Sequence, residues 1–216
     1  MKKLLLLIVT ISITIFGFAQ ETDKGDKKSR EVLNRLTAKT EAYGTIKAEF
    51  NYKMKNIEAD INESTEGTLF VKGDKYRLLI AGQLVISDGV TIWTYIADAE
   101  EVQINSVEDS EESITPSNLL TSYNDDYKSK CVRETFQYGT TVHVIDLTPI
   151  EGKSYYKVGV IIDKEKDQLM EITIYDKNGS TYSYILNSFI PNIELDDTKF
   201  LFNADDYPDA EIVDMR

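Results

Sequence analysis

The chain has 216 residues, which is room for one domain, and its formal net charge is −13. This acidic balance argues against nucleic acid and anionic membrane surfaces as partners, because both attract basic proteins. The only cysteine, Cys131, excludes an internal disulfide, so the fold has to be stabilised by its core.

The N-terminus has the pattern of an export signal. A basic start, M-K-K, precedes an apolar run over residues 4–18, which is short for a membrane span. Gly17 and Ala19 then supply small residues at the −3 and −1 positions of a cleavage site. We therefore expect residues 1–19 to be a signal peptide cleaved after Ala19, and residues 20–216 to form a single exported domain.

A helix is expected first in the mature chain. Val32, Leu33 and Leu36 follow the spacing of an apolar helical stripe. Ser29 is a plausible N-cap, and Gly44 is expected to end the helix.

The period then changes to two, which predicts a series of strands. Apolar and polar residues alternate from 46 to 55, so this strand should have one dry and one wet face. Residues 83–96, Q-L-V-I-S-D-G-V-T-I-W-T-Y-I, predict a hairpin with Asp88-Gly89 as a primed turn, and Asn178-Gly179 predicts a second one. Further strands are expected at 67–72, 76–80, 102–107, 131–138, 142–148, 155–162, 169–175 and 181–189.

An acidic stretch interrupts this rhythm at residues 108–116. Thr115 and Pro116 then predict the start of a short amphipathic helix that carries Leu119 and Leu120. Residues 197–216 are expected to be irregular.

Short connections make neighbouring strands antiparallel, and a long meander curls until it closes or is covered. The predicted fold is mainly β with helices (α+β). It is an incomplete, strongly curved antiparallel β-barrel of about 10–11 strands wrapped around helices.

The sequence offers little for catalysis or metal binding. His143 is the only histidine, and Ser87 and Asp88 are better explained by the turn than by a hydrolase site. One histidine and one cysteine do not make a zinc site, and the acidic pairs lack the spacing of a calcium loop. We expect a monomer that is not an enzyme and binds no metal or cofactor.

The order of the segments nevertheless resembles a known family. A helix is followed by I-K-A-E-F-N-Y-K-M, G-T-L-F-V-K, Y-R-L-L-I and V-I-S-D-G-V-T-I-W-T-Y-I, and the chain closes on K-F-L-F-N-A-D-D-Y-P-D-A-E-I-V-D-M-R. Along nearly all of the mature sequence it resembles the LolA family of periplasmic lipoprotein carriers.

This resemblance implies an incomplete barrel closed by helices, with an apolar cavity between them. Its members accept a triacylated lipoprotein from an inner-membrane transporter and pass it to an outer-membrane acceptor. Well-studied members carry an arginine and a proline after the second strand, and the arginine latches the lid. Gly73 and Asp74 stand at that place here, so no such latch is visible.

With the resemblance, the apolar sheet face becomes a candidate lipid-binding cavity, because adaptable aromatic and methionine side chains suit variable acyl chains. Two alternatives stay open, a carrier of another lipid or amphiphile and a structural β-domain with a filled core. The expected lining is Phe50, Tyr52, Met54, Leu69, Tyr76, Leu78, Ile80, Trp93, Leu119 and Leu120.

Overall fold

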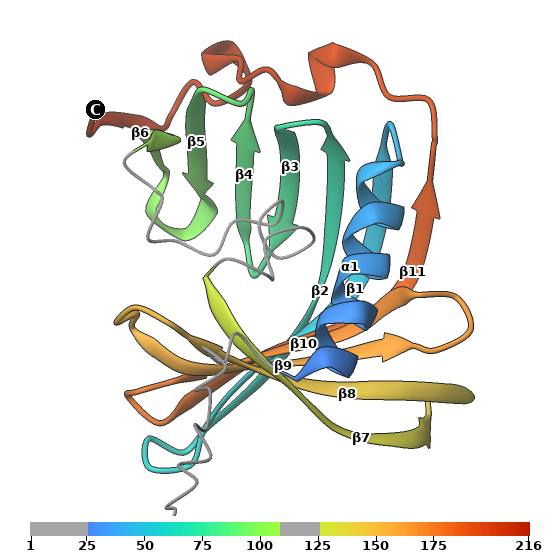
Figure 1. The fold of residues 1–216 in the computed structure, drawn as a ribbon. Coiled ribbons are helices and arrows are strands. Elements are labelled where there is room, and N and C mark those ends of the chain that lie inside the picture. The colour runs from blue at the N-terminus through green and yellow to red at the C-terminus, as the bar shows by residue number, and fades with distance from the viewer. Residues whose placement is uncertain (1–25, 109–125) are drawn as a thin grey trace, which may run out of the picture.

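The computed structural model describes residues 26–108 and 126–216. In these residues a single sheet carries twelve strands, and an α-helix, α1 (Lys27–Glu41), lies against its concave side (Figure 1). The strands are β1 (Ile46–Asn56), β2 (Ile61–Lys72), β3 (Lys75–Ile80), β4 (Gln83–Ser87), β5 (Thr91–Ile96), β6 (Glu101–Ser106), β7 (Tyr127–Gln137), β8 (Thr140–Pro149), β9 (Tyr155–Asp163), β10 (Gln168–Asp176), β11 (Ser180–Pro191) and β12 (Glu211–Asp214).

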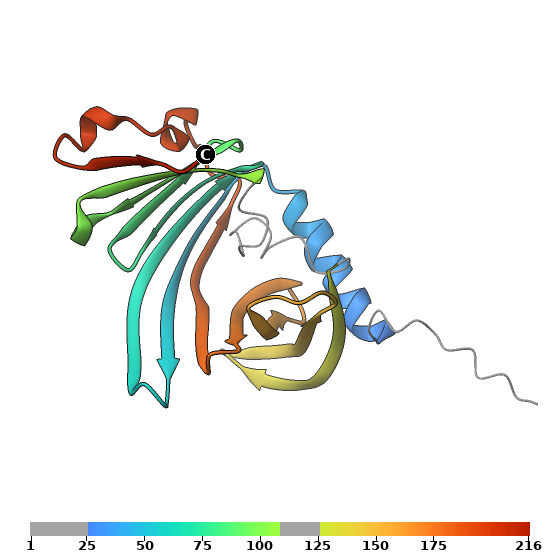
Figure 2. The ribbon, with the colours of Figure 1, turned by 90° about the vertical axis from the view of Figure 1, so that its left-hand side faces the viewer.

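The sheet is open and strongly curved. Its strands follow the spatial order β12-β6-β5-β4-β3-β2-β1-β11-β10-β9-β8-β7, so that β12 and β7 form its two edges. Neighbours run antiparallel, as in β1 with β11 and β2, except for β12, which runs parallel to β6. Figure 2 shows the sheet bending around the space that α1 enters. The expected incomplete, curved antiparallel barrel is confirmed.

Several elements and boundaries differ from the sequence prediction. The strand count is higher because Glu211–Asp214, expected to be irregular, pairs with β6. β2 begins at Ile61 rather than Gly67, since its polar first half pairs with β1 even though it has no apolar alternation. The N-cap of α1 is Asp26, whose side chain accepts from the Ser29 N–H, and the predicted cap Ser29 lies inside the helix. The helix predicted after Thr115 lies outside the described residues.

Both predicted hairpins form, but neither has a primed turn with two positive φ angles. In the first, Asp88 N–H donates to Thr91 O at 3.3 Å and only Gly89 of the Asp-Gly pair has positive φ, at 96°. In the second, Gly179 N–H donates to Asp176 O at 3.2 Å, and Gly179 alone has positive φ, at 85°. In each hairpin the turn is displaced by one residue from the predicted pair, and only the glycine of that pair has positive φ.

The core lies between α1 and the face of the sheet that we call the inner face. Val32, Leu33 and Leu36 of α1 are each no more than 2% exposed. They belong to the same buried cluster as Phe50 and residues of β8–β10. Gly67 is required beside this cluster, because a Cβ there would lie 2.4 Å from the Phe50 ring.

The C-terminal segment covers part of the opposite face, which we call the outer face. It contains two short 3-10 helices, η3 (Asp197–Phe200) and η4 (Ala204–Asp206), and Phe200 is fully buried. Lys72 Nζ donates to Leu195 O at 3.0 Å. In Figure 2 this red segment and α1 lie on opposite sides of the sheet.

Candidate functional site

A continuous apolar row crosses the inner face from β1 to β4. The register pairs Ala48 of β1 with Leu69 of β2. Leu69 in turn pairs with Leu78 of β3, which pairs with Val85 of β4. Directly paired residues of neighbouring strands share a face, so these side chains form one surface.

The exposure of this surface increases with distance from α1. Ala48 and Leu69 are buried in the core, whereas Leu78, Ile80 and Val85 pack against the core and are only half-buried. We call the half-buried apolar residues of β1, β3, β4 and β11 the inner apolar surface. They are Tyr52, Met54, Leu78, Ile80, Val85, Tyr182, Tyr184, Leu186 and Phe189.

Tyrosines form the part of the inner apolar surface nearest to β11. The Tyr184 ring lies 5.3 Å from the Tyr52 ring and 5.7 Å from the Phe50 ring, measured between centroids. Burial raises the pKa of Tyr184 to about 12, and burial with the neighbouring Tyr182 and Glu63 raises the pKa of Tyr52. Both phenols are therefore uncharged at neutral pH, and the surface they contribute is amphipathic but neutral.

The predicted lining residues divide into three groups. Tyr52, Met54, Leu78 and Ile80 belong to the inner apolar surface. Phe50, Leu69 and Tyr76 share the same face but are buried, with exposures of 5%, 8% and 6%. Leu119 and Leu120 lie outside the described residues.

Trp93 is on the wrong face for the expected lining. Ile92, its neighbour, pairs with Ser87, which itself pairs with the inner-face residue Tyr76. Trp93 therefore points to the outer face, where its ring stacks on Phe202 at 6.0 Å with an interplanar angle of 14°. Strand alternation alone left the choice of face open, because both faces of β5 are apolar.

Sequence reasoning missed the contribution of β4 and β11 to this surface. Tyr182, Tyr184 and Leu186 alternate along β11, and that alternation was the available signal. Their inward direction follows from the register with β1, in which Tyr184 pairs with Tyr52.

Polar contacts attach the start of α1 to the edge strand β7. Asp26 N–H donates to Ser129 O at 3.0 Å, and Cys131 N–H donates to the Asp26 carboxylate at 2.6 Å. The Ser29 and Ser129 hydroxyls lie 2.7 Å apart and are buried. Burial would raise the pKa of Asp26, but the N–H donors of Ser29 and Cys131 lower it overall, so the carboxylate stays ionised.

Ion pairs extend this attachment along the helix. Lys28 pairs with Glu134 of β7 at 2.6 Å, and Arg35 pairs with Asp167 of the β9–β10 turn at 3.0 Å. Gly73, at the place of the family arginine, lies in the β2–β3 turn with a φ of 57°. The helix is thus held by polar contacts at its N-terminus and further along its length, on the β7–β10 side of the sheet.

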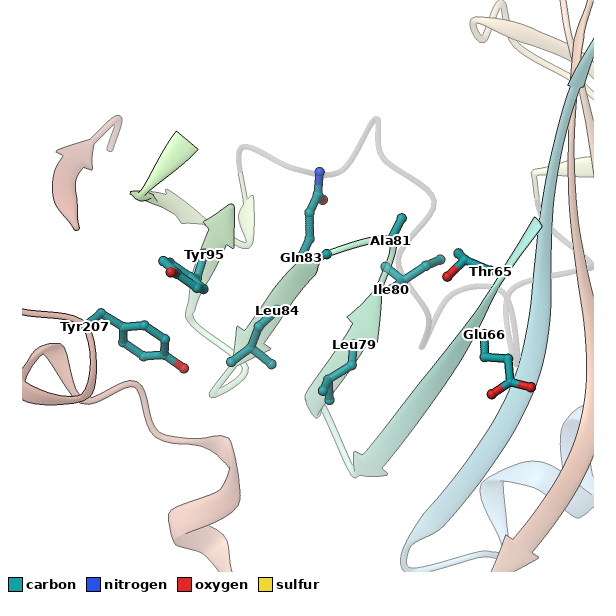
Figure 3. Close-up of a pocket in the computed structure, with 10 residues that line it drawn as sticks. Thr65, Glu66, Leu79, Ile80, Ala81, Gln83, Leu84, Tyr95 and Tyr207 are labelled. Carbon is teal, nitrogen blue, oxygen red and sulfur yellow. The ribbon is translucent and has the colours of Figure 1, made fainter. Parts of the chain in front are cut away.

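A groove of about 400 Å³ lies on the outer face, beside the β3–β4 turn (Figure 3). Leu79 pairs with Leu84, and Leu84 with Tyr95, so these three residues share one face of the sheet. Tyr207 of the C-terminal segment forms the far wall. The complete lining is Thr65, Glu66, Leu79, Ile80, Ala81, Gly82, Gln83, Leu84, Tyr95 and Tyr207.

The described residues bring together no cluster of three or more histidine, cysteine or acidic side chains that could hold a metal ion. Cys131 is only partly buried, and burial raises the pKa of its thiol. Among the same residues, no helix has the length and apolar character needed to cross a membrane.

Comparison with known proteins identifies the family. The model of the family described as "Outer membrane lipoprotein carrier protein LolA" matches residues 41–203, well over half of the chain. The chain belongs to the LolA family.

Two relatives carry the same family description, and one solved structure shares the fold. The chain is 28% identical over 144 residues to an outer-membrane lipoprotein carrier protein of Psychromonas ingrahamii. The match covers 63% of this chain and 66% of the relative, so this chain spans just under two thirds of the relative's length. A protein of the same name from Shewanella pealeana is 27% identical over 84% of this chain and 85% of its own. An uncharacterised conserved protein from Thermus thermophilus shares the fold with a TM-score of 0.59 and 12% identity, over 87% of this chain and 99% of that one. Membership of the LolA family supports a carrier role.

Proposed function

We propose that this LolA-family protein is a non-enzymatic periplasmic carrier that holds the acyl chains of lipoproteins against the inner apolar surface. In this proposal residues 1–19 are the signal peptide, and the chain shuttles as a monomer. An inner-membrane transporter supplies the cargo and an outer-membrane acceptor receives it. One observation carries the proposal: the core does not end under α1 but continues as a half-buried apolar surface over β1, β3, β4 and β11.

The chemistry of this surface suits a ligand that must be released. Aliphatic and neutral aromatic side chains contact an acyl chain without directional hydrogen bonds, so the contacts tolerate chains of different length. Such contacts gain free energy only in proportion to the area they cover. Cargo can therefore leave when a partner competes for the same acyl chains.

A pair of substitutions at adjacent residues tests the proposal. Leu78 lies on the inner apolar surface, whereas Leu79, the next residue of β3, points to the outer face and is 43% exposed. Leu78→Glu should leave the circular dichroism spectrum folded and should abolish displacement of a hydrophobic fluorescent probe by acylated peptide. An unpaired carboxylate against hydrocarbon costs several kcal/mol or becomes protonated. Leu79→Glu is the matched control and should retain probe displacement.

The outcomes separate the carrier from the alternatives. An unfolded Leu78→Glu protein indicates a sealed core and a structural domain, because a sealed core does not tolerate the charge. Folded variants that bind the probe equally well remove β3 from the site. Displacement by free amphiphiles but not by acylated peptides indicates a carrier of another lipid.

A further inference from the structure

The outer-face groove lies mostly on the opposite side of the sheet from the inner apolar surface, and Ile80, at the end of β3, belongs to both. Leu78 and Leu79 are neighbours on β3, and their side chains point to opposite faces of the sheet. The apolar part of the groove lining consists mainly of Leu79, Leu84, Tyr95 and Tyr207 (Figure 3). A ligand that contacts Leu79 and Leu84 would lie on the opposite side of the sheet from one that contacts Leu78 and Val85.

Aromatic contacts hold the far wall of the groove in place. Tyr207 lies 4.5 Å from Tyr95, and 5.4 Å from Phe202, between ring centroids. Phe202 in turn stacks on Trp93. The wall therefore joins β5 to a segment more than a hundred residues later in the sequence, and the groove depends on this long-range packing rather than on one loop.

One carboxylate lies in the groove lining, and three more belong to residues close in sequence to lining residues or their hydrogen-bond partners. Glu66 is itself part of the groove, and Asp206 and Asp209 flank Tyr207 in the sequence. Asp98 follows Ala97, whose N–H donates to Gly82 O at 3.3 Å in the β3–β4 turn. In residues 26–108 and 126–216, no lysine or arginine forms an ion pair with any of these four carboxylates.

We propose that this groove docks a segment of a partner protein that presents a basic side chain beside an apolar one. The apolar lining provides the contact area, and the unpaired carboxylates complement a lysine or arginine. Anionic lipid is disfavoured by the same carboxylates. A second copy is disfavoured because a twofold contact would place the acidic groups of the two molecules against each other.

The position of the groove has a consequence for transport. A carrier that receives or delivers cargo has to contact its partner while the cargo is still bound. A partner docked on the outer face contacts the opposite side of the sheet from the inner apolar surface, so it can bind the carrier with or without cargo. The groove itself does not depend on the proposed function, and the two can be tested on the same protein.

The test uses a defined peptide and the purified protein. The probe is a tetrapeptide with a leucine and a phenylalanine between two lysines, its ends blocked. One matched peptide replaces both lysines with glutamate, and another replaces both apolar residues with serine. Binding is measured by titration calorimetry and located by amide chemical-shift changes in two-dimensional NMR.

The lysine peptide should bind and shift the amides of Leu79, Leu84, Tyr95 and Tyr207, while both matched peptides should not bind. Leu79→Ser should weaken binding about tenfold, because an apolar contact is lost. Glu66→Gln should weaken it about twofold to fivefold, as expected for an exposed ion pair. Ile57→Ser and Glu58→Gln, at exposed positions of the β1–β2 turn, are the controls and should have no effect.

Three results would overturn the proposal. Shift changes spread over the acidic surface, unaffected by Leu79→Ser, would mean that the peptide binds by net charge alone. Shifts at these residues with a fatty acid but not with the peptide would make the groove a lipid site. Concentration-dependent shifts without peptide, together with a dimer by light scattering, would assign it to a second copy. None of these results bears on Leu78→Glu, so acyl-chain binding is judged separately.

Discussion

His143 lies on β8 with 3% of its surface exposed, and its Nδ1 is 3.4 Å from an oxygen of Glu134. Nδ1 has no hydrogen-bond partner in the described structure. Burial lowers the pKa of His143; Glu134 acts against this, while Lys28 and Lys164 add to it. The ring is therefore kept neutral, in an environment where a proton would be unfavourable.

This burial predicts a pH dependence of stability. The unfolded chain, with a histidine pKa of about 6.5, binds a proton at a higher pH than the folded chain does. The free energy of unfolding should therefore fall as the pH drops below about 6.5, and should not depend on His143 above it. Urea unfolding between pH 5 and 8 measures this directly, since the chain has no other histidine.

His143→Gln is the control and should show a flatter profile in that range. Glu134 does not contribute to the change in stability between pH 5 and 8. Hydrogen bonds from Lys164 and Lys28 hold its pKa at about 2, so it titrates below that range. If the variant and the parent lost stability in parallel, burial of His143 would not be the cause.

At the scale of secondary-structure elements, Asp26 links the start of α1 to the sheet. The Asp26 carboxylate accepts from the N–H groups of both Ser29 and Cys131. The same carboxylate therefore caps the helix and also accepts a hydrogen bond from an N–H of the edge strand β7.

Asp26→Ala should lower the free energy of unfolding by about 1–2 kcal/mol, the usual cost of losing an N-cap, and should speed amide exchange in the first turns of α1. Glu31→Ala is the matched control, because Glu31 is an exposed acid of the same helix with only a 3.8 Å ion pair to Lys27. Equal exchange rates in the two variants would show that Asp26 does not anchor the helix.

The C-terminal segment offers a second prediction at this scale, because the only tryptophan reports on it. Trp93 stacks on Phe202 on the outer face. Phe202→Ala should shift the fluorescence of Trp93 to the red as water reaches the ring, whereas adding acylated peptide to the parent should leave the emission maximum unchanged. A ligand-induced shift in the parent would place the ligand on the outer face instead.

At the scale of the whole molecule, the sequence predicted the open curved sheet because period-two alternation and short turns specify antiparallel neighbours. It could not assign the face of Trp93, since that depends on the register through β4 to β3 and not on β5 alone. It also missed β12, whose four residues pair in parallel with β6. The segment just before β12 packs on β5 through Phe202 and Tyr207, and no local pattern in β12 reveals this.

The residues of the candidate site could be predicted from the sequence only in part. Tyr52, Met54, Leu78 and Ile80 were found from alternation and the family resemblance. Which inner-face residues are buried and which remain half-exposed depends on where α1 crosses the sheet, and that is set by the contacts of Asp26 and Ser29 with β7. Such contacts join residues about a hundred positions apart, and no local pattern reveals them.

The central claim is that acyl chains occupy the inner apolar surface, and native mass spectrometry of protein purified from the periplasm tests it most directly. The parent protein should carry a bound species that releases acyl chains on dissociation, and Leu78→Glu, purified in the same way, should lack it. Parent protein that emerges at the mass of the bare polypeptide, with no acyl-chain species in its lipid extract, would contradict the claim.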